Sequence, residues 1–152
     1  MKIQTLCLLR DGDRILLAMK KRGFGAGNWN GVGGKLQEGE TVEEAALREM
    51  KEEIGVTAEH SALEKAAELT FHFKDGTDIL VHTFLVNSWN GEPHESEEMA
   101  PKWYRIADIP FQSMWPDDKH WMPLVLAGKK IAAEFHFTAD AKDFEKMNIK
   151  EI

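Results

Sequence analysis

Glutamate side chains are concentrated between Glu40 and Glu53, and three of them fall within residues 48–53. On a helix, at about 100° per residue, Glu49 and Glu53 lie on the same stripe as the apolar Val42. Glu52 lies about 80° to one side of that stripe. Carboxylates that face the body of a protein this closely repel one another and lose hydration, so they need a cation. A hard divalent ion, magnesium above all, would satisfy them, although a solvated acidic helix is the alternative that these residues leave open.

One helix is predicted to carry these glutamates. Thr41 is a good N-cap, and Glu44, three residues later, completes a Thr-x-x-Glu capping box. Strong helix formers follow at residues 45–51, and Gly55 tolerates the left-handed conformation with which helices end. The segment therefore predicts a helix with two carboxylates on the side that faces the protein body.

A glycine-rich loop precedes this helix. Six glycines fall within residues 23–34, so the backbone must turn sharply there or approach a ligand closely. The loop is not a P-loop, because no Ser or Thr follows its Gly-Lys pair. Only Asn28, Trp29 and Asn30 could read a ligand by hydrogen bonds or stacking, and a turn role for the asparagines is equally open.

Apolar or alternating runs separated by turn signals predict the strands around these two segments. Asp-Gly pairs at residues 11–12 and 75–76 predict two hairpins. The predicted strands comprise residues 3–9, 14–19, 67–73, 79–87, 102–106 and 131–137. A second helix is predicted to end near Gly128, and we expect a helix or loop in the charged tail after Asp140. These elements together predict an α+β architecture or an α/β/α sandwich.

Composition and charge limit the class of protein. The 152 residues are 43% hydrophobic and 30% charged, which predicts one globular domain spanning residues 1–152. A net charge of −7 disfavours stable binding to nucleic acid but permits a small phosphorylated ligand that brings its own magnesium. The single cysteine, Cys7, excludes an internal disulfide and indicates a cytoplasmic location. No signal pattern or membrane-spanning run is visible, so we expect no membrane association.

The spacing around the helix resembles a known family signature. Gly34 is followed after five residues by Glu40, and seven residues later come Arg48-Glu49-Met50, then Glu52-Glu53 and Gly55-Val56. This pattern is similar to the Nudix box at every specified position. The resemblance implies an α+β Nudix fold, an α/β/α sandwich with a mixed central sheet. It also implies a hydrolase in which water attacks a phosphorus and the box glutamates hold Mg²⁺, for which Mn²⁺ can substitute.

Further segments resemble the MutT-homologue branch of this family. They comprise residues 20–27, 29–31, 95–99 and 114–118. This resemblance implies hydrolysis of oxidised or otherwise modified purine (deoxy)nucleoside triphosphates to the monophosphate and pyrophosphate, a reaction that sanitises the nucleotide pool. The candidate substrates are 8-oxo-dGTP, 2-hydroxy-dATP and O6-methyl-dGTP, and members of the branch are monomers by default.

The box also implies a set of metal ligands. The implied ligands are the carbonyl of Gly33 or Gly34 and the side chains of Glu49, Glu52 and Glu53. Glu98, in a short acidic loop, would be a further ligand or would activate the water. Arg48 would hold the glutamates in place through charge-assisted hydrogen bonds.

Residues outside the box are implied to bind the nucleotide. Lys20 would contact the triphosphate, and Trp115 would stack on the purine. Asn30, Asp117 and Asp118 would read the edge of the base. Two adjacent aspartates in an apolar pocket cannot both ionise easily, so one would keep a proton and could donate as well as accept; helix capping is their alternative role. The other implied lining residues are Thr5, Phe24, Phe71, Phe73 and Ile79, the last at a position where the family usually has Met.

Other activities leave marks that this sequence lacks. Family members that act on ADP-ribose usually carry a proline shortly past the box, where Thr70 and Phe71 stand, and members that act on diadenosine polyphosphates usually carry a tyrosine slightly later. A general nucleoside triphosphate or dinucleoside pyrophosphohydrolase is the alternative within the family. A non-catalytic nucleotide-binding Nudix module is the alternative from another class; such modules commonly lose box glutamates, and none is missing.

Overall fold

The computed structural model describes residues 1–152, with eight strands, two α-helices and short 3₁₀ turns. The strands are β1 (Lys2–Asp11), β2 (Arg14–Lys20), β3 (Trp29–Asn30), β4 (Leu63–His72), β5 (Asp78–Val86), β6 (Met99–Arg105), β7 (Ile131–Phe137) and β8 (Phe144–Glu151). The helices are α1 (Val42–Ile54) and α2 (Asp118–Leu126). None of the helices is long and apolar enough to cross a membrane.

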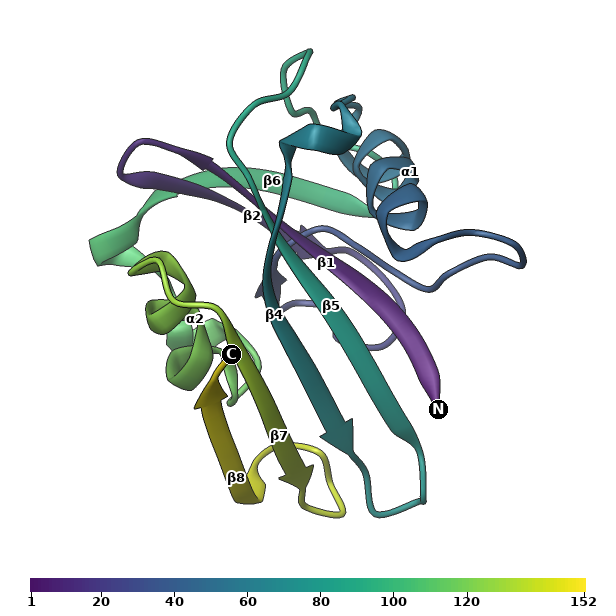
Figure 1. Ribbon diagram of the computed structural model, residues 1–152, viewed down its shortest axis with the longest axis vertical. Helices are drawn as coiled ribbons and strands as arrows, with labels where there is room; N and C mark the ends of the chain where they lie inside the picture. The colour runs from purple at the N-terminus through teal and green to yellow at the C-terminus, as the bar shows by residue number, and fades with distance from the viewer.

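The strands form one mixed sheet in the order β3-β2-β1-β5-β4-β7-β8, with β6 paired to β2 (Figure 1). The pairs β1/β5 and β4/β7 are parallel, and the other pairs are antiparallel. Parallel neighbours need long crossover connections, and α1 and α2 lie within those two connections. The mixed sheet and its helices confirm the predicted α+β class.

The predicted hairpin of β1 and β2 forms only at its tip. The two strands pair at Arg10 with Ile15 and at Asp11 with Arg14, and then diverge. Farther along β1, the end of the glycine-rich loop takes the place of β2, because Val32 exchanges two backbone hydrogen bonds with Cys7. The loop lies so close to β1 that a Cβ on Gly33 would stand 1.9 Å from the Thr5 carbonyl oxygen. The glycines therefore allow a backbone segment to lie directly against β1.

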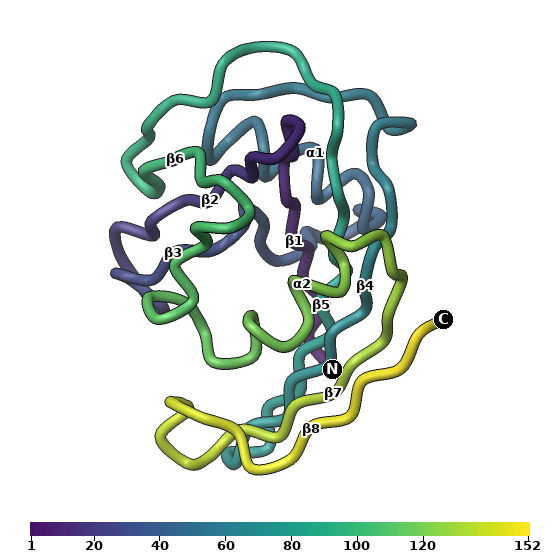
Figure 2. The backbone as a smooth tube through the Cα atoms, turned by 90° about the vertical axis from the view of Figure 1, so that its left-hand side faces the viewer, coloured from purple at the N-terminus to yellow at the C-terminus, as the bar shows by residue number.

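Two hydrophobic clusters lie on opposite faces of the sheet. One joins α1 to the sheet through residues such as Met50, Ile54 and Phe84. The other joins α2 to the sheet through residues such as Trp121 and Phe135. The helices thus form the two outer layers of the predicted sandwich. Figure 2 shows β7 and β8 running side by side along the lower edge of the molecule.

The caps of α1 are those that the sequence predicts. The Thr41 side chain accepts a hydrogen bond from the Glu44 backbone N–H at 3.1 Å. Gly55 ends the helix at φ 74°, in the left-handed region, and donates its N–H to the Lys51 carbonyl. These caps fix where α1 begins and ends, and so they fix the direction in which its glutamates point.

The prediction for the C-terminal tail was wrong. Instead of a helix or loop, residues 144–151 form β8, which pairs with β7 from Ile131–Glu151 to Phe137–Phe144. Most of β8 is exposed, so its sequence lacks the apolar alternation that signals a strand. The free edge of β7 and the packing of Phe144 against Phe135 and Phe137 specify it instead.

Candidate active site

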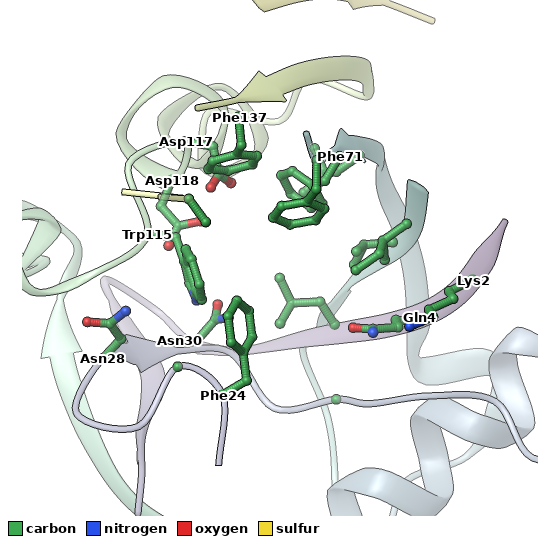
Figure 3. Close-up of a pocket in the computed structure, with 18 of the residues that line it drawn as sticks. Lys2, Gln4, Phe24, Asn28, Asn30, Phe71, Trp115, Asp117, Asp118 and Phe137 are labelled. Carbon is green, nitrogen blue, oxygen red and sulfur yellow. The ribbon is translucent and has the colours of Figure 1, made fainter. Parts of the chain in front are cut away.

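A cavity of about 780 Å³ opens between the diverging part of β1, the glycine-rich loop, β4 and the start of α2. Phe24 and Trp115 lie on one side of this cavity and Phe71 and Phe137 on the other (Figure 3). All ten side chains predicted to bind the nucleotide line it: Thr5, Lys20, Phe24, Asn30, Phe71, Phe73, Ile79, Trp115, Asp117 and Asp118. The cavity therefore brings together predicted residues from four distant parts of the chain.

The glutamates of α1 differ in exposure as the helical wheel predicts. Glu53 is 2% exposed, whereas the side chains of Glu49 and Glu52 are 14% and 56% exposed. One Glu53 oxygen accepts the Gly33 N–H at 3.3 Å, and the other has no hydrogen-bond partner. The two inward carboxylates therefore lie beside the glycine-rich loop, and one buried oxygen is unsatisfied.

The Glu49 carboxylate lies directly against Gly34, because a Cβ there would lie 2.7 Å from one of its oxygens. The Gly34 carbonyl accepts the Thr5 N–H at 2.8 Å, whereas the Gly33 carbonyl accepts no hydrogen bond from the protein. Of the two carbonyls that the sequence left open as metal ligands, the one at Gly33 is thus the one with its lone pairs available.

The surroundings of Glu53 disfavour the charged form of its side chain. Burial above all, then the neighbouring Glu49 carboxyl and last Glu98, raise the pKa of Glu53 to about 9. That influence places Glu98 close enough to act on the same centre, although its side chain is exposed. The Glu98 loop is tied down because its carbonyl accepts the Lys21 N–H at 2.9 Å and Lys21 also pairs with Glu95.

Arg48 connects the remaining carboxylates of α1. Its guanidinium donates to Glu40 at 2.6 Å and 2.9 Å, to Glu49 at 2.9 Å and to Glu52 at 3.1 Å. It also donates to the Lys35 carbonyl at 3.0 Å. The hydrogen bonds from Arg48 lower the pKa of Glu40. Arg48 therefore orients Glu49 and Glu52 but makes no hydrogen bond to Glu53.

These residues fit a divalent cation. The possible ligands are all oxygen atoms. They come from the carboxylates of Glu49, Glu52, Glu53 and Glu98 and from the free Gly33 carbonyl, and one buried Glu53 oxygen among them is unsatisfied. Hard cations such as Mg²⁺ prefer oxygen ligands of this kind. A bound cation would relieve the repulsion that otherwise keeps a proton on Glu53.

A second acidic pair lies at the base of the cavity. Asp117 and Asp118 are each 3% exposed, and Trp121 Nε1 donates to both, at 2.8 Å and 3.2 Å. Burial raises the pKa of Asp117, and burial together with the Asp117 charge raises that of Asp118 well above its usual value. Neither side chain caps α2, because no side-chain capping hydrogen bond forms at its N-terminus. The capping alternative is therefore excluded, and the raised pKa values favour a proton on one carboxyl of the pair.

Aromatic rings form the walls of the cavity. The rings of Phe24 and Trp115 are 5.2 Å apart, and Trp115 stands edge-on to Phe137 at 6.4 Å. Phe73 stacks on Phe137 at 5.2 Å. Phe137 was not among the predicted site residues, although the apolar alternation of residues 131–137 placed it on the inward face of a strand. The parallel pairing of β7 with β4, which sequence periodicity does not specify, brings it to the cavity.

The polar side chains around the rim are partly committed to the protein. Lys20 Nζ donates to the Phe24 carbonyl at 2.7 Å. The Asn30 side-chain oxygen accepts the Gly31 N–H at 2.9 Å, which leaves its NH₂ group free to donate to a ligand. Lys2 and Gln4 lie on β1 at the end of the cavity away from the two aspartates (Figure 3). Sequence reasoning missed these two and the further lining lysines Lys35 and Lys74.

The arrangement separates two kinds of chemistry within one site. Acidic side chains and a free carbonyl beside α1 can bind a cation, and lysines at the rim can contact an anion. Aromatic walls with a partly protonated carboxyl pair can hold a flat heterocycle and exchange hydrogen bonds with its edge. A nucleotide combines these features, since it has a charged phosphate chain and a planar base.

Known proteins are similar to this chain in sequence and in fold. The family model for the NUDIX domain matches residues 2–125. The chain is 47% identical to the oxidized purine nucleoside triphosphate hydrolase of Mus musculus over 137 residues, which cover 90% of this chain and 86% of that protein. It is 49% identical to the protein of the same name from Danio rerio over the same shares. The solved structure of a MutT protein from Bacillus halodurans superposes with a TM-score of 0.84 at 25% identity, covering 99% of this chain and 98% of that one.

Proposed function

Because the chain belongs to the Nudix hydrolase family, we propose that it hydrolyses oxidised purine nucleoside triphosphates to the monophosphate and pyrophosphate. Such a reaction removes damaged nucleotides from the pool. One observation carries the proposal: a single cavity joins the oxygen-rich centre at Glu49 and Glu53 to the buried pair Asp117 and Asp118. The first can serve a phosphate chain and the second a modified base.

Nudix proteins typically depend on a divalent metal, and we infer that Mg²⁺ serves this chain, with Mn²⁺ as a substitute. The proposed ligands are the Gly33 carbonyl, Glu49, Glu52 and Glu53, and Glu98 is either a further ligand or the group that activates the water. When bound, the ion supplies positive charge that offsets the charge developing on the phosphoryl oxygens. The unsatisfied oxygen and the raised pKa of Glu53 support this assignment, because both result from the burial of this carboxyl beside the Glu49 carboxyl.

The chain's own residues position the reacting groups. Arg48 holds Glu49 and Glu52 through charge-assisted hydrogen bonds, so their oxygens stay fixed while the substrate binds. Glu98, exposed and adjacent, is the carboxylate with freedom to accept a proton from the attacking water. Lys20 contributes a positive charge at the rim of the cavity, where the phosphate chain would enter.

The base is proposed to enter between Trp115 and the facing aromatic wall. A protonated Asp118 donates to a ring nitrogen or carbonyl, Asp117 accepts from an N–H, and the free NH₂ of Asn30 donates to a base oxygen. Because a protonated carboxyl both donates and accepts, the same pair can read 8-oxoguanine and 2-hydroxyadenine. The apolar floor comprises Phe71, Phe73 and Ile79 together with the Thr5 side of β1.

Residues 1–152 are proposed to act as one domain and as a monomer. Both helices pack on the same sheet, which supports a single domain. A cytoplasmic location is proposed with the substrate, because nucleoside triphosphate pools are intracellular.

A panel of nucleoside triphosphates with Mg²⁺ tests the proposal. We expect kcat/KM for 8-oxo-dGTP and 2-hydroxy-dATP to exceed that for dGTP and dATP by at least about tenfold, the difference that one or two hydrogen bonds can make. O6-methyl-dGTP belongs in the same panel. Equal values for all purines would refute the substrate assignment but not the hydrolase. Binding without pyrophosphate release would instead favour the non-catalytic module.

A further inference from the structure

Two histidines and a glutamate meet on the outer face of the sheet, away from the cavity. They are His72 on β4 and Glu134 and His136 on β7, and their ligand atoms all lie within 4.8 Å of one another. The imidazoles of His72 and His136 stack with ring centroids 4.5 Å apart. Neither the phosphate end nor the base end of the cavity uses these residues.

The sheet register itself builds this cluster. In the parallel pair β4/β7, His72 lies opposite His136, and Thr70 lies opposite Glu134. Successive side chains of a strand point to opposite faces, so His72 and His136 share one face while Phe71 and Phe135 share the other. The sheet thereby fixes the backbone positions of all three residues.

A fourth residue orients one of the imidazoles. Asp78 on β5 lies opposite His72, and its carboxylate is 2.8 Å from His72 Nδ1. This contact favours a hydrogen on Nδ1 and leaves Nε2 toward Glu134, whose oxygen is 3.4 Å away. Metal-binding histidines almost always donate their second ring N–H to a carboxylate in this way, which fixes the tautomer and the ring.

The donor set selects a class of ion different from that at α1. Two imidazoles and one carboxylate suit Zn²⁺, Ni²⁺ or Co²⁺, whereas Mg²⁺ prefers oxygen ligands throughout. In a tetrahedral site, two ligand atoms at about 2.1 Å from a zinc ion lie about 3.4 Å from each other. Rotation of the exposed Glu134 and the partly exposed His136 would close the difference from 4.8 Å.

A cluster without an ion is the competing explanation. A protonated His72 could bridge Asp78 and Glu134 unaided. That explanation leaves His136 without a role, since its ring nitrogens have no hydrogen-bond partner although the ring lies against His72. Lys146 lies opposite His136 on β8, but it is exposed and its ammonium can turn to solvent.

We propose that His72, Glu134 and His136 form a second metal site that binds Zn²⁺ or a similar borderline divalent ion, with Asp78 orienting His72. Three protein ligands leave one tetrahedral position for water. The ion ties β4 to β7 behind the wall that carries Phe71 and Phe135. It binds the folded protein and not the unfolded chain, so it stabilises the fold.

Calorimetric titration with ZnCl₂ in saturating Mg²⁺, which keeps the α1 centre occupied, tests this site. We expect one zinc per wild-type chain and a rise in the unfolding temperature. His136→Gln should weaken zinc binding by at least about tenfold, and Asp78→Asn by about tenfold to 100-fold. His82→Gln is the matched control, because His82 lies on the same face but pairs with Lys65 and Glu68.

The outcomes separate the two explanations. Equal zinc binding by wild type, His136→Gln and His82→Gln would overturn the site, as would a wild-type protein that zinc neither binds nor stabilises. The Co²⁺-loaded protein offers a second readout, since its visible absorption should lose the bands of nitrogen coordination in His72→Gln. Hydrolysis with Mg²⁺ should be unchanged in His136→Gln, which shows that the variant is folded.

Discussion

Glu49 and Glu53 on α1 and Asp117 and Asp118 at the start of α2 are both pairs of neighbouring carboxylates on one cavity. Each pair contains one buried oxygen without a hydrogen-bond partner, at Glu53 and at Asp118. Burial raises the pKa in both pairs. The chemistry of the side chains is therefore the same, and the surroundings differ.

The surroundings determine whether each pair is better suited to a metal cation or to a proton. Glu53 lies among further acids, Glu49 and Glu98, and near a free carbonyl, so its site has room and ligands for a cation. Asp117 and Asp118 share the indole N–H of Trp121 in an aromatic pocket that lacks such ligands. Under the proposed function, the first pair exchanges its proton for a metal, and the second pair keeps a proton that it can donate to a base.

Glu53→Gln alters the first pair, and we expect it to give the largest effect. We expect kcat to fall by more than about 100-fold, because the charge stabilisation lost with the metal is worth several kcal/mol. The metal-free variant should unfold at a temperature no lower than wild type at pH 7, since a neutral amide resembles the protonated carboxyl. Steady-state kinetics and thermal unfolding in EDTA measure the two effects. The exposed Glu92→Gln is the control, and a Glu53→Gln enzyme with full activity would contradict the metal assignment.

Asp117→Asn should act on the second pair alone. We expect the ratio of kcat/KM for 8-oxo-dGTP to that for dGTP to fall by about tenfold to 100-fold, because an unpaired buried polar group costs about 1–3 kcal/mol. The metal dependence should stay that of wild type, which separates the two pairs. An unchanged ratio across the purine panel and across pH would remove Asp117 from base recognition.

The two pairs should differ in how Mg²⁺ changes their contribution to the pH dependence of stability. In the folded protein without metal, Glu53 keeps its proton up to about pH 9, whereas in the unfolded chain it loses the proton near its ordinary value of 4.5. Between these values the unfolded state binds fewer protons, so stability falls as pH rises. Thermal unfolding should therefore show a falling midpoint in EDTA from pH 5 to 9 and a smaller fall in Mg²⁺. The fall that persists in Mg²⁺ belongs to the other groups whose pKa is raised, which are the two aspartates and His72. Identical slopes in the two buffers would show that no cation replaces the Glu53 proton.

Trp121→Phe alters the hydrogen bonds of the second pair, and we expect it to give the smallest effect. It removes the N–H that both aspartates share while keeping a ring in the core, where Trp121 is 0% exposed. We expect a loss of about 1–3 kcal/mol in unfolding free energy from the unpaired acceptors, with a smaller loss of base selectivity than in Asp117→Asn. Chemical denaturation measures the first. A Leu16→Val change on the other face of the sheet gives a core control without a polar partner.

The sequence predicted the parts of the site that local rules govern. Capping by Thr41, the stop at Gly55 and the spacing of Glu49 and Glu53 are properties of one helix, and all appear as predicted. The cavity residues outside the box came from the family resemblance, since residue periodicity alone left Asn30 open between a turn and a ligand contact.

Features that depend on which strands pair, beyond the hairpins that turn signals mark, escaped prediction. β8 forms because β7 offers an edge, and its exposed residues carry no periodic signal. Phe137 joins the cavity, and His72 meets His136, only because β4 and β7 are parallel neighbours in one register. Nothing local to either strand specifies that partner.

The divergence of β1 from β2 has a consequence for how activities could diversify on this scaffold. One edge of β1 is bonded to β5 and the other to the glycine-rich loop, so a single strand fixes the distance between the catalytic helix and the base-reading wall. Changes on β4 or β7 can reshape that wall while the hydrogen bonds of β1 hold the helix in place. A new base preference can therefore evolve in one half of the molecule while the residues proposed for hydrolysis in the other half stay unchanged.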